Sequence, residues 1–167
     1  MAELTQKERL QPSLLDRLAD DAPEKEQESR EQRVLSISKL RQCVLRDLAW
    51  LLNTSTLDTI QNLNDYPLVS HSVVNYGIHD LVGTTLSSAD VPDIQKQIRQ
   101  AIWDFEPRIF PASVVVKVSV SDNEMNHNAM TFDIEGDLWA QPLPLRLYLR
   151  TELDLETGNM DIIDRGG

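Results

Sequence analysis

The chain has 167 residues, 41% hydrophobic and 26% charged, so it is long enough for one domain with a core of its own. Its net charge of −11, with no Lys or Arg between Asp47 and Gln95, argues against nucleic acid and anionic membranes as partners, because both attract cationic proteins. No apolar run approaches the roughly 20 residues that cross a bilayer and no signal-peptide core opens the chain, so we expect a cytoplasmic protein without direct membrane insertion.

The sequence predicts a flexible N-terminal segment over residues 1–33 and a single domain over residues 34–167. Residues 19–33 combine mixed charge, low hydrophobicity and a proline. Before them, Ser13 and Asp16 form a weak helix start, and three leucines would share one face of a short helix near 13–19. A helix this short is unstable alone, so it must dock on its own domain or on another chain.

An amphipathic helix is expected from Glu31 to Leu52, with Asn53 as its stop. Apolar residues recur there every three or four positions, at Val34, Ile37, Leu40, Val44, Leu48 and Leu51. Residues 54–90 mix Asn, Asp, Ser, Gly and Pro with short apolar pieces, which predicts mostly irregular structure with one short helix near 56–62. The Lys- and Arg-free stretch in this part of the chain is compatible with a basic protein partner, and solvated acidic loops are the alternative explanation.

A second helix is predicted to begin at Asp90, an N-cap candidate, with Pro92 in its first turn. Its apolar stripe is Ile94, Ile98, Ile102 and Phe105. Pro107 disfavours helical geometry at Glu106, so the helix should end there. With Arg108 next in the chain, this exit would rigidly present two opposite charges.

Beyond Pro111 the apolar period changes from 3.6 to 2, which predicts four successive strands. They are "SVVVKVSVS", "MTFDIEGDL", "PLPLRLYLRTELDL" and a short strand around 160–163 after the turn "ETGN". Short connections favour an antiparallel meander with one apolar face. The predicted fold is therefore α+β, with the helices packed on one face of a four-stranded antiparallel sheet.

Catalysis by Glu106 is one hypothesis. Beside Trp103 and Phe105 it could serve as a general acid, with Asp104, Glu124 or Glu135 as the second carboxylate of a glycosidase. Arg108 opposes this role because it favours the charged carboxylate. The alternative is that the stretch only terminates a helix.

No cofactor or metal site is predicted. His71, His79 and His127 form no recognised metal-ligand spacing, and the chain lacks GxSxG, P-loop and GxGxxG motifs. The lone Cys43 falls among core positions of the first long helix and is expected to be a buried small hydrophobe.

Nearly the whole chain from about Ser13 resembles the TssE family, the baseplate subunits of the bacterial type VI secretion system, which are similar to the lysozyme-like wedge proteins of contractile phage tails. The matching pieces occur in the family's order, and "SVVNYG" and "FEPR" are the most specific of them. They are "LLDRL" (14–18), "LRDLAWLLNT" (45–54), "HSVVNYGIHDL" (71–81), "AIWDFEPRI" (101–109), "FDIEGDL" and "LDLETGNM".

The resemblance implies a structural protein without catalytic activity. Glu106, Pro107 and Arg108 match the family's Glu-Pro-Arg motif, which implies contact with the helical core bundle of TssF and TssG. It also implies partnership with TssK and with the sheath subunits TssB and TssC, the sheet offering a strand edge to the first sheath ring. Two alternatives stay open, a peptidoglycan hydrolase using Glu106 and a regulatory anti-adaptor, a role for which the same fold is also used.

Overall fold

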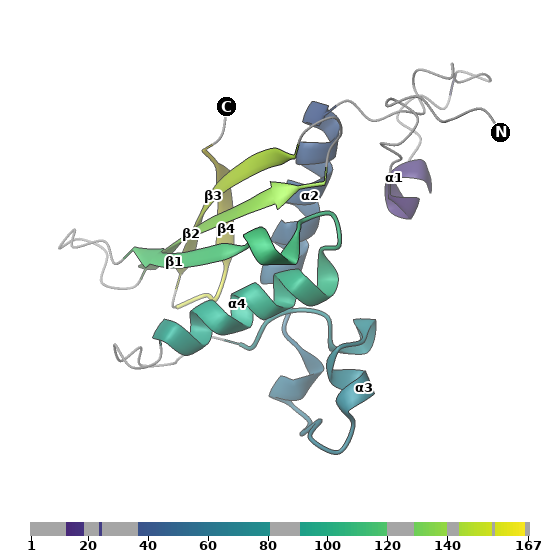
Figure 1. Ribbon diagram of the computed structural model, residues 1–167. Coiled ribbons are helices and arrows are strands. Elements are labelled where there is room, and N and C mark those ends of the chain that lie inside the picture. Colours follow the sequence, from purple (N-terminus) through teal and green to yellow (C-terminus); the bar gives the residue numbers. More distant parts are fainter. Residues whose placement is uncertain are drawn as a thin grey trace.

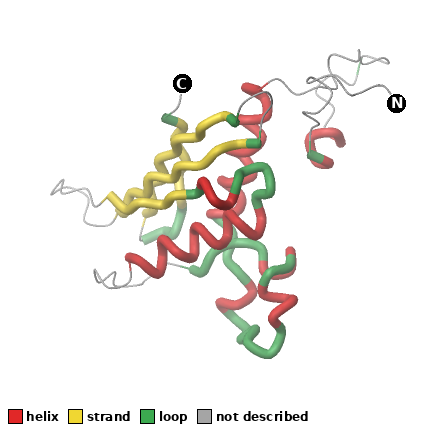
Figure 2. Tube along the Cα trace, in the orientation of Figure 1, coloured by secondary structure: helices red, strands yellow, loops and turns green. Residues whose placement is uncertain are grey.

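A four-stranded antiparallel sheet with two long helices on its apolar face makes up most of the structure (Figure 1). This computed structural model describes residues 13–18, 24, 37–80, 91–119, 129–139, 144–154 and 156–165. Figure 2 distinguishes the helices from the strands, and along the chain the helices precede the strands, as the change of period predicted. The α+β class and the meander are confirmed.

The two long helices are α2 (Ile37–Leu52) and α4 (Val91–Phe105). The described side chains of their predicted stripes are buried, except that Phe105 at the end of α4 is half-buried, and Cys43 is buried as expected. The expected start of α2 at Glu31 and the N-cap Asp90 lie outside the described residues. Asn53 ends α2 as predicted, and its side chain also exchanges two hydrogen bonds of 2.8 and 2.9 Å with the backbone of Met160, which ties the helix to the last strand.

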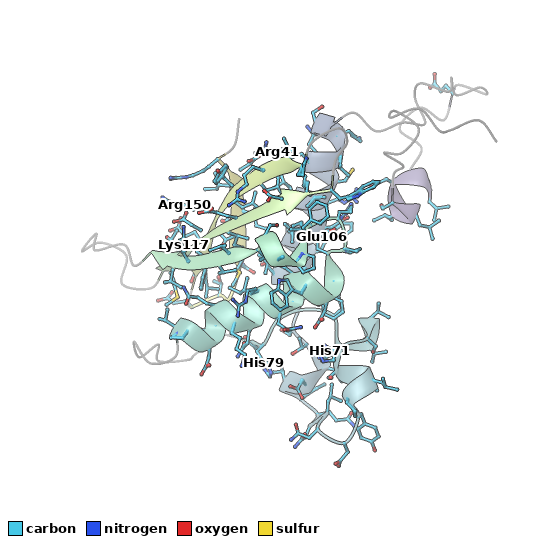
Figure 3. All side chains as sticks on the ribbon, in the orientation of Figure 1. Arg41, His71, His79, Glu106, Lys117 and Arg150 are labelled. Atoms are coloured by element: carbon cyan, nitrogen blue, oxygen red, sulfur yellow. The ribbon has the colours of Figure 1, made fainter. Side chains whose placement is uncertain are left out.

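The sheet consists of β1 (Val115–Ser119), β2 (Ala129–Leu138), β3 (Leu145–Asp154) and β4 (Met160–Asp164), paired in chain order. Alternate residues of β2 and β3 are buried against the helices, which confirms the period-2 prediction. The opposite face carries cross-strand ion pairs, such as Arg150 with Asp133 and Lys117 with Glu135 (Figure 3). Both faces of the sheet are thus accounted for: the helices cover one, and charged pairs line the other.

A lobe formed by residues 54–80 extends from the two helices. It holds η2 (Leu57–Thr59), α3 (Pro67–Ser70) and η3 (Val73–Asn75), so the single short helix predicted near 56–62 is present as a 3-10 turn, and two further short helices were missed. A parallel bridge between Ser55 and Ile78 closes the lobe. Gly77 permits this closure, since its φ is 127° and a Cβ there would lie 2.2 Å from the Thr54 carbonyl oxygen.

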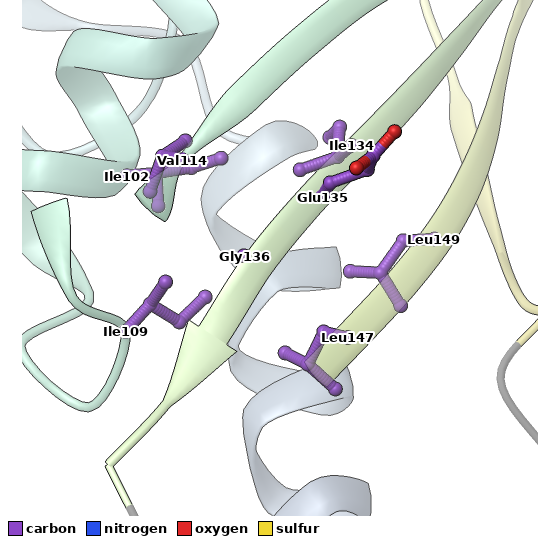
Figure 4. A pocket seen from close by; sticks show the side chains of 8 residues that line it. All are labelled: Ile102, Ile109, Val114, Ile134, Glu135, Gly136, Leu147 and Leu149. Atoms are coloured by element: carbon purple, nitrogen blue, oxygen red, sulfur yellow. The ribbon is translucent and has the colours of Figure 1, made fainter. Parts of the chain in front are cut away.

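The contact between α4 and the sheet contains a small apolar hollow (Figure 4). Ile102, Ile109, Val114 and residues of β2 and β3 line it, and they leave no room for a water molecule. Gly136 allows the close approach, because a Cβ there would lie 2.9 Å from a methyl group of Ile109. This hollow is a packed contact that holds the segment after α4 against β2, with no space for a ligand.

The predicted N-terminal helix is present as α1 (Leu14–Leu18). Residues 25–36 lie outside the described residues, so the proposed boundary at residue 33 stays a prediction. Among the described helices, none combines the length and the apolar character needed to span a membrane.

Candidate partner-binding site

The segment after α4 is fixed by backbone hydrogen bonds to β2. The helix ends at Phe105, as Pro107 predicts, and the Ile109 N–H donates to the Glu106 carbonyl at 3.2 Å. The Trp139 N–H then donates to the Arg108 carbonyl at 2.7 Å, and the Phe110 N–H donates to the Asp137 carbonyl at 2.9 Å. Pro107 therefore lies at an exposed turn between two anchored points.

Glu106 and Arg108 pair with each other across this turn. Arg108 Nε donates to Glu106 Oε1 at 2.7 Å, Nη2 donates to Oε2 at 2.5 Å, and the Arg108 backbone N–H adds a third bond to Oε1 at 3.1 Å. The pair is bidentate, the strongest arrangement of a guanidinium and a carboxylate. Only 3% of Glu106 is exposed, so the prediction that the turn presents both charges is wrong for the glutamate.

The pair belongs to a longer charge network of Asp16, Arg46, Asp47, Glu106 and Arg108. Arg108 Nη2 also donates to Asp47 Oδ2 at 2.5 Å, and Arg46 donates to the other oxygen of Asp47 at 2.7 Å from Nη2. Arg46 Nη1 then reaches Asp16 Oδ1 of α1 at 2.8 Å. Three acids and two bases alternate from α1 through α2 to the turn after α4, and α1 docks on its own domain by this route.

The network shifts the pKa values of Asp16 and Arg108 toward their charged forms. Burial raises the pKa of Asp16, but its hydrogen bonds with Ser13, Arg46 and Cys43 outweigh burial and lower it to about 2. Burial lowers the pKa of Arg108, but its hydrogen bonds and charge interactions with Glu106 and Asp47 together raise it by more. The pKa of Arg108 therefore lies above its ordinary value. Burial, followed by the bond to Asp16, raises the pKa of the Cys43 thiol. Asp16 and Arg108 are thus held charged, and Cys43 is held as the thiol.

Tyr76 brings the lobe to this network. Its hydroxyl donates to the Asp47 carbonyl at 3.3 Å, and its ring meets the Phe105 ring edge to face with centroids 5.2 Å apart. Burial first, and then the negative charges of Asp47 and Glu106, raise the pKa of Tyr76. The charge network and Tyr76 therefore bring together residues from four separate pieces of the sequence, namely "LLDRL", "LRDLAWLLNT", "SVVNYG" and "FEPR".

Sequence reasoning singled out Glu106, Pro107 and Arg108 at this site and missed Arg46, Asp47 and Tyr76. The missed residues lie inside the quoted motifs, so the motifs themselves were the available signal. What the sequence did not show was that residues so far apart in the chain would touch.

The carboxylates considered for catalysis are not gathered around Glu106. Asp104 accepts hydrogen bonds from His71 at 2.9 Å and from Gln100 at 3.0 Å, whereas Glu135 pairs with Lys117 and Arg146 on the sheet's charged face. Glu124 lies outside the described residues. Because both oxygens of Glu106 already accept bonds from Arg108, that carboxyl is not poised to donate a proton to a substrate.

The described residues contain no group of three or more His, Cys, Asp or Glu side chains that could hold a metal ion. His71 and His79 instead pair with Asp104 and Asp58. His127 lies outside the described part.

Exposed aromatic side chains flank the turn. Phe110 and Trp139 are each at least 40% exposed, and they lie next to the backbone bonds that anchor Arg108. Pro107, between Glu106 and Arg108 in the chain, is exposed as well. An arginine held among exposed aromatic and proline side chains has the composition of the energetic centre of a protein–protein interface.

Comparison with known proteins points to one family. The family model GPW_gp25, described as baseplate wedge protein gp25, matches residues 38–143, more than half of the chain. A search of curated proteins finds no match. A solved structure from Geobacter sulfurreducens, called a tail lysozyme, is similar at 17% identity over 70% of this chain and 94% of that chain, with a TM-score of 0.45. A similarity this low carries no inference about activity.

Proposed function

Because the chain belongs to the baseplate wedge protein gp25 family, whose role is structural, we propose that it is a non-enzymatic baseplate subunit of a type VI secretion system. The matched range 38–143 includes α2, the lobe, α4 and the Glu106–Arg108 turn. The finer assignment to type VI secretion is supported by the sequence resemblance to TssE. A cytoplasmic location, at the inner face of the membrane, follows from that assignment.

The Glu106-Pro107-Arg108 turn is proposed to bind the helical core bundle of TssF and TssG. The observation that carries this proposal is the way in which Glu106 and Asp47 hold Arg108 from two sides, next to exposed Pro107. In this arrangement Glu106 is a positioning residue that the partner does not touch. Arg108 and Pro107 provide the contact surface, flanked by Phe110 and Trp139.

One donor of Arg108 supports a docking role. Among the buried side-chain nitrogen and oxygen atoms of the described residues, Nη1 of Arg108 is the one without a hydrogen-bond partner. A buried donor left unpaired is costly, roughly 1 to 3 kcal/mol. A small shift of the turn on binding would let a carbonyl or carboxylate of the partner accept from it.

Contact with the sheath is proposed to use the sheet. Its two edge strands are β1 and β4, and an edge strand exposes backbone groups that can pair with another chain. TssB and TssC are the proposed partners there, and TssK is proposed as a further baseplate neighbour.

Affinity purification from the native cell tests this function most broadly. Recovery of TssF and TssG with the chain is the expected result. Recovery of a protease adaptor without baseplate subunits would favour the anti-adaptor alternative. Peptidoglycan cleavage by the purified protein, lost in Glu106→Gln, would replace the structural assignment with a hydrolase.

A further inference from the structure

The lobe of residues 54–80 exposes apolar side chains that the proposed function does not use. Leu68 of α3 is 89% exposed and Val73 of η3 is 81% exposed. The other exposed large apolar residues of the lobe are Ile60, Tyr66 and Val74. Figure 1 shows α3 beyond α4, on the side away from the sheet. We call these five residues the apolar patch.

Internal hydrogen bonds hold the lobe in place, so this exposure does not come from a loosely arranged loop. Buried Asn75 accepts from the Asp58 N–H at 3.0 Å and donates to the Ser70 carbonyl at 2.9 Å. These two bonds connect η2, α3 and η3 with one another. Leu63 of the lobe is buried. The apolar patch is therefore presented by a preformed scaffold, which lowers the entropic cost of binding.

The charge around the apolar patch selects the kind of partner. Asp58 and Asp65 are exposed on the lobe, and the chain has no Lys or Arg from Asp47 to Gln95. The two histidines of the lobe, His71 and His79, are each engaged with an aspartate. A phosphate-bearing partner would be repelled. A second copy would bring the same acidic lobe and a further net charge of −11.

We propose that the lobe is a second docking surface, which binds an apolar, positively charged segment of another protein. Leu68 and Val73 enter the partner's apolar surface, and Asp65 faces its Lys or Arg side chains. This surface uses none of the residues of the Glu106-Pro107-Arg108 turn. It therefore goes beyond the proposed function, and either surface can be disabled alone.

Titration of the full-length chain with two synthetic amphipathic helical peptides tests the proposal. One peptide carries leucine on one face of the helix and lysine on the other, and the second peptide carries glutamate in place of lysine. We expect the leucine–lysine peptide to bind, with amide chemical shifts changing within residues 54–80, and the leucine–glutamate peptide not to bind. In Leu68→Ser combined with Val73→Ser, the Kd should rise about tenfold or more. The matched control Ile163→Ser removes an exposed apolar residue on β4 and should leave the Kd unchanged.

Three outcomes would overturn the proposal: no binding of the leucine–lysine peptide, shift changes outside the lobe, or equal binding by the double variant and the wild type. Concentration-dependent self-association mapped to residues 54–80 would show that a second copy is the occupant, and would overturn it as well. The shift map uses wild-type protein, so the test stands even if a variant folds poorly.

Discussion

The guanidinium of Arg108 donates a hydrogen bond to the carboxylate of Asp47, 61 positions earlier in the chain, with 2.5 Å between Nη2 and Oδ2. This bond ties the turn after α4 to the middle of α2. The Glu-Pro-Arg turn is thus part of the tertiary structure as well as a candidate contact, so its residues have separable effects on folding and on binding.

Glu106→Ala should lower the free energy of unfolding by about 2–4 kcal/mol, because it leaves a largely buried guanidinium with one carboxylate fewer. The partial exposure of Arg108 places the value below that of a fully enclosed pair. Urea unfolding of the isolated chain measures it. Lys117→Ala, which breaks an exposed pair on the sheet, is the control and should change stability by less than about 1 kcal/mol. Equal small effects in both variants would show that Glu106 does not hold the turn.

Docking of α1 should depend on acidity through Asp16. The folded-state pKa of Asp16, about 2, lies below the unfolded value of 3.8, so its contribution is present above pH 4 and is lost as pH falls toward 2. We expect wild type to exceed Asp16→Asn in unfolding free energy by about 1 kcal/mol at pH 6, after allowing for the solvent that reaches the Arg46 side of this part-buried pair, and the difference to vanish near pH 2. Urea unfolding at several pH values measures it. A difference independent of pH would contradict the assignment.

Arg46→Ala should expose Cys43. Asp16 bonds both to Arg46 and to the buried Cys43 thiol, so releasing α1 removes a group that covers the sulfur. The rate of labelling by a thiol reagent at neutral pH is expected to rise about tenfold or more. Arg41→Ala, on the same helix but paired with Asp164, is the matched control. Labelling that rises equally in both variants would point to general loosening of α2 and not to release of α1.

Gly77→Ala should destabilise the lobe and the domain by more than about 2 kcal/mol. An alanine there would have an unfavourable positive φ, and its Cβ would clash with the carbonyl oxygen of Thr54. Gly158→Ala also has a positive φ, of 73°, in the turn before β4, and should cost about 1 kcal/mol. Thermal unfolding of the two variants compares them. If the order were reversed, the close contact at Thr54 would not be the determining feature.

Periodic segments were predictable from sequence because each carries its own signal. Burial at every third or fourth position in α4, and at alternate positions in β2, is a local pattern that needs no knowledge of the rest of the chain. The lobe was not predictable in this way. Its helices depend on Asn75 reaching Asp58, 17 residues earlier, and on the contact of Gly77 with Thr54.

The candidate site was half predictable. The position of Pro107 marked Glu106 and Arg108, but Asp47 and Tyr76, which join the same network, come from other elements. Sequence spacing indicated charges at a helix end. Only the tertiary arrangement shows that one of the two charges is enclosed, and that Pro107 and part of Arg108 remain exposed.

The affinity of the purified chain for a TssF–TssG complex tests the central claim most directly, because it separates contact from folding. Arg108→Lys keeps the charge but loses the fork of donors, and Pro107→Gly releases the exposed turn. The control Arg150→Ala removes a charge from the sheet. Calorimetric titration should give a Kd about tenfold or more weaker for Arg108→Lys and for Pro107→Gly, and a wild-type Kd for Arg150→Ala. Wild-type affinity in both turn variants, with folding intact, would contradict the account.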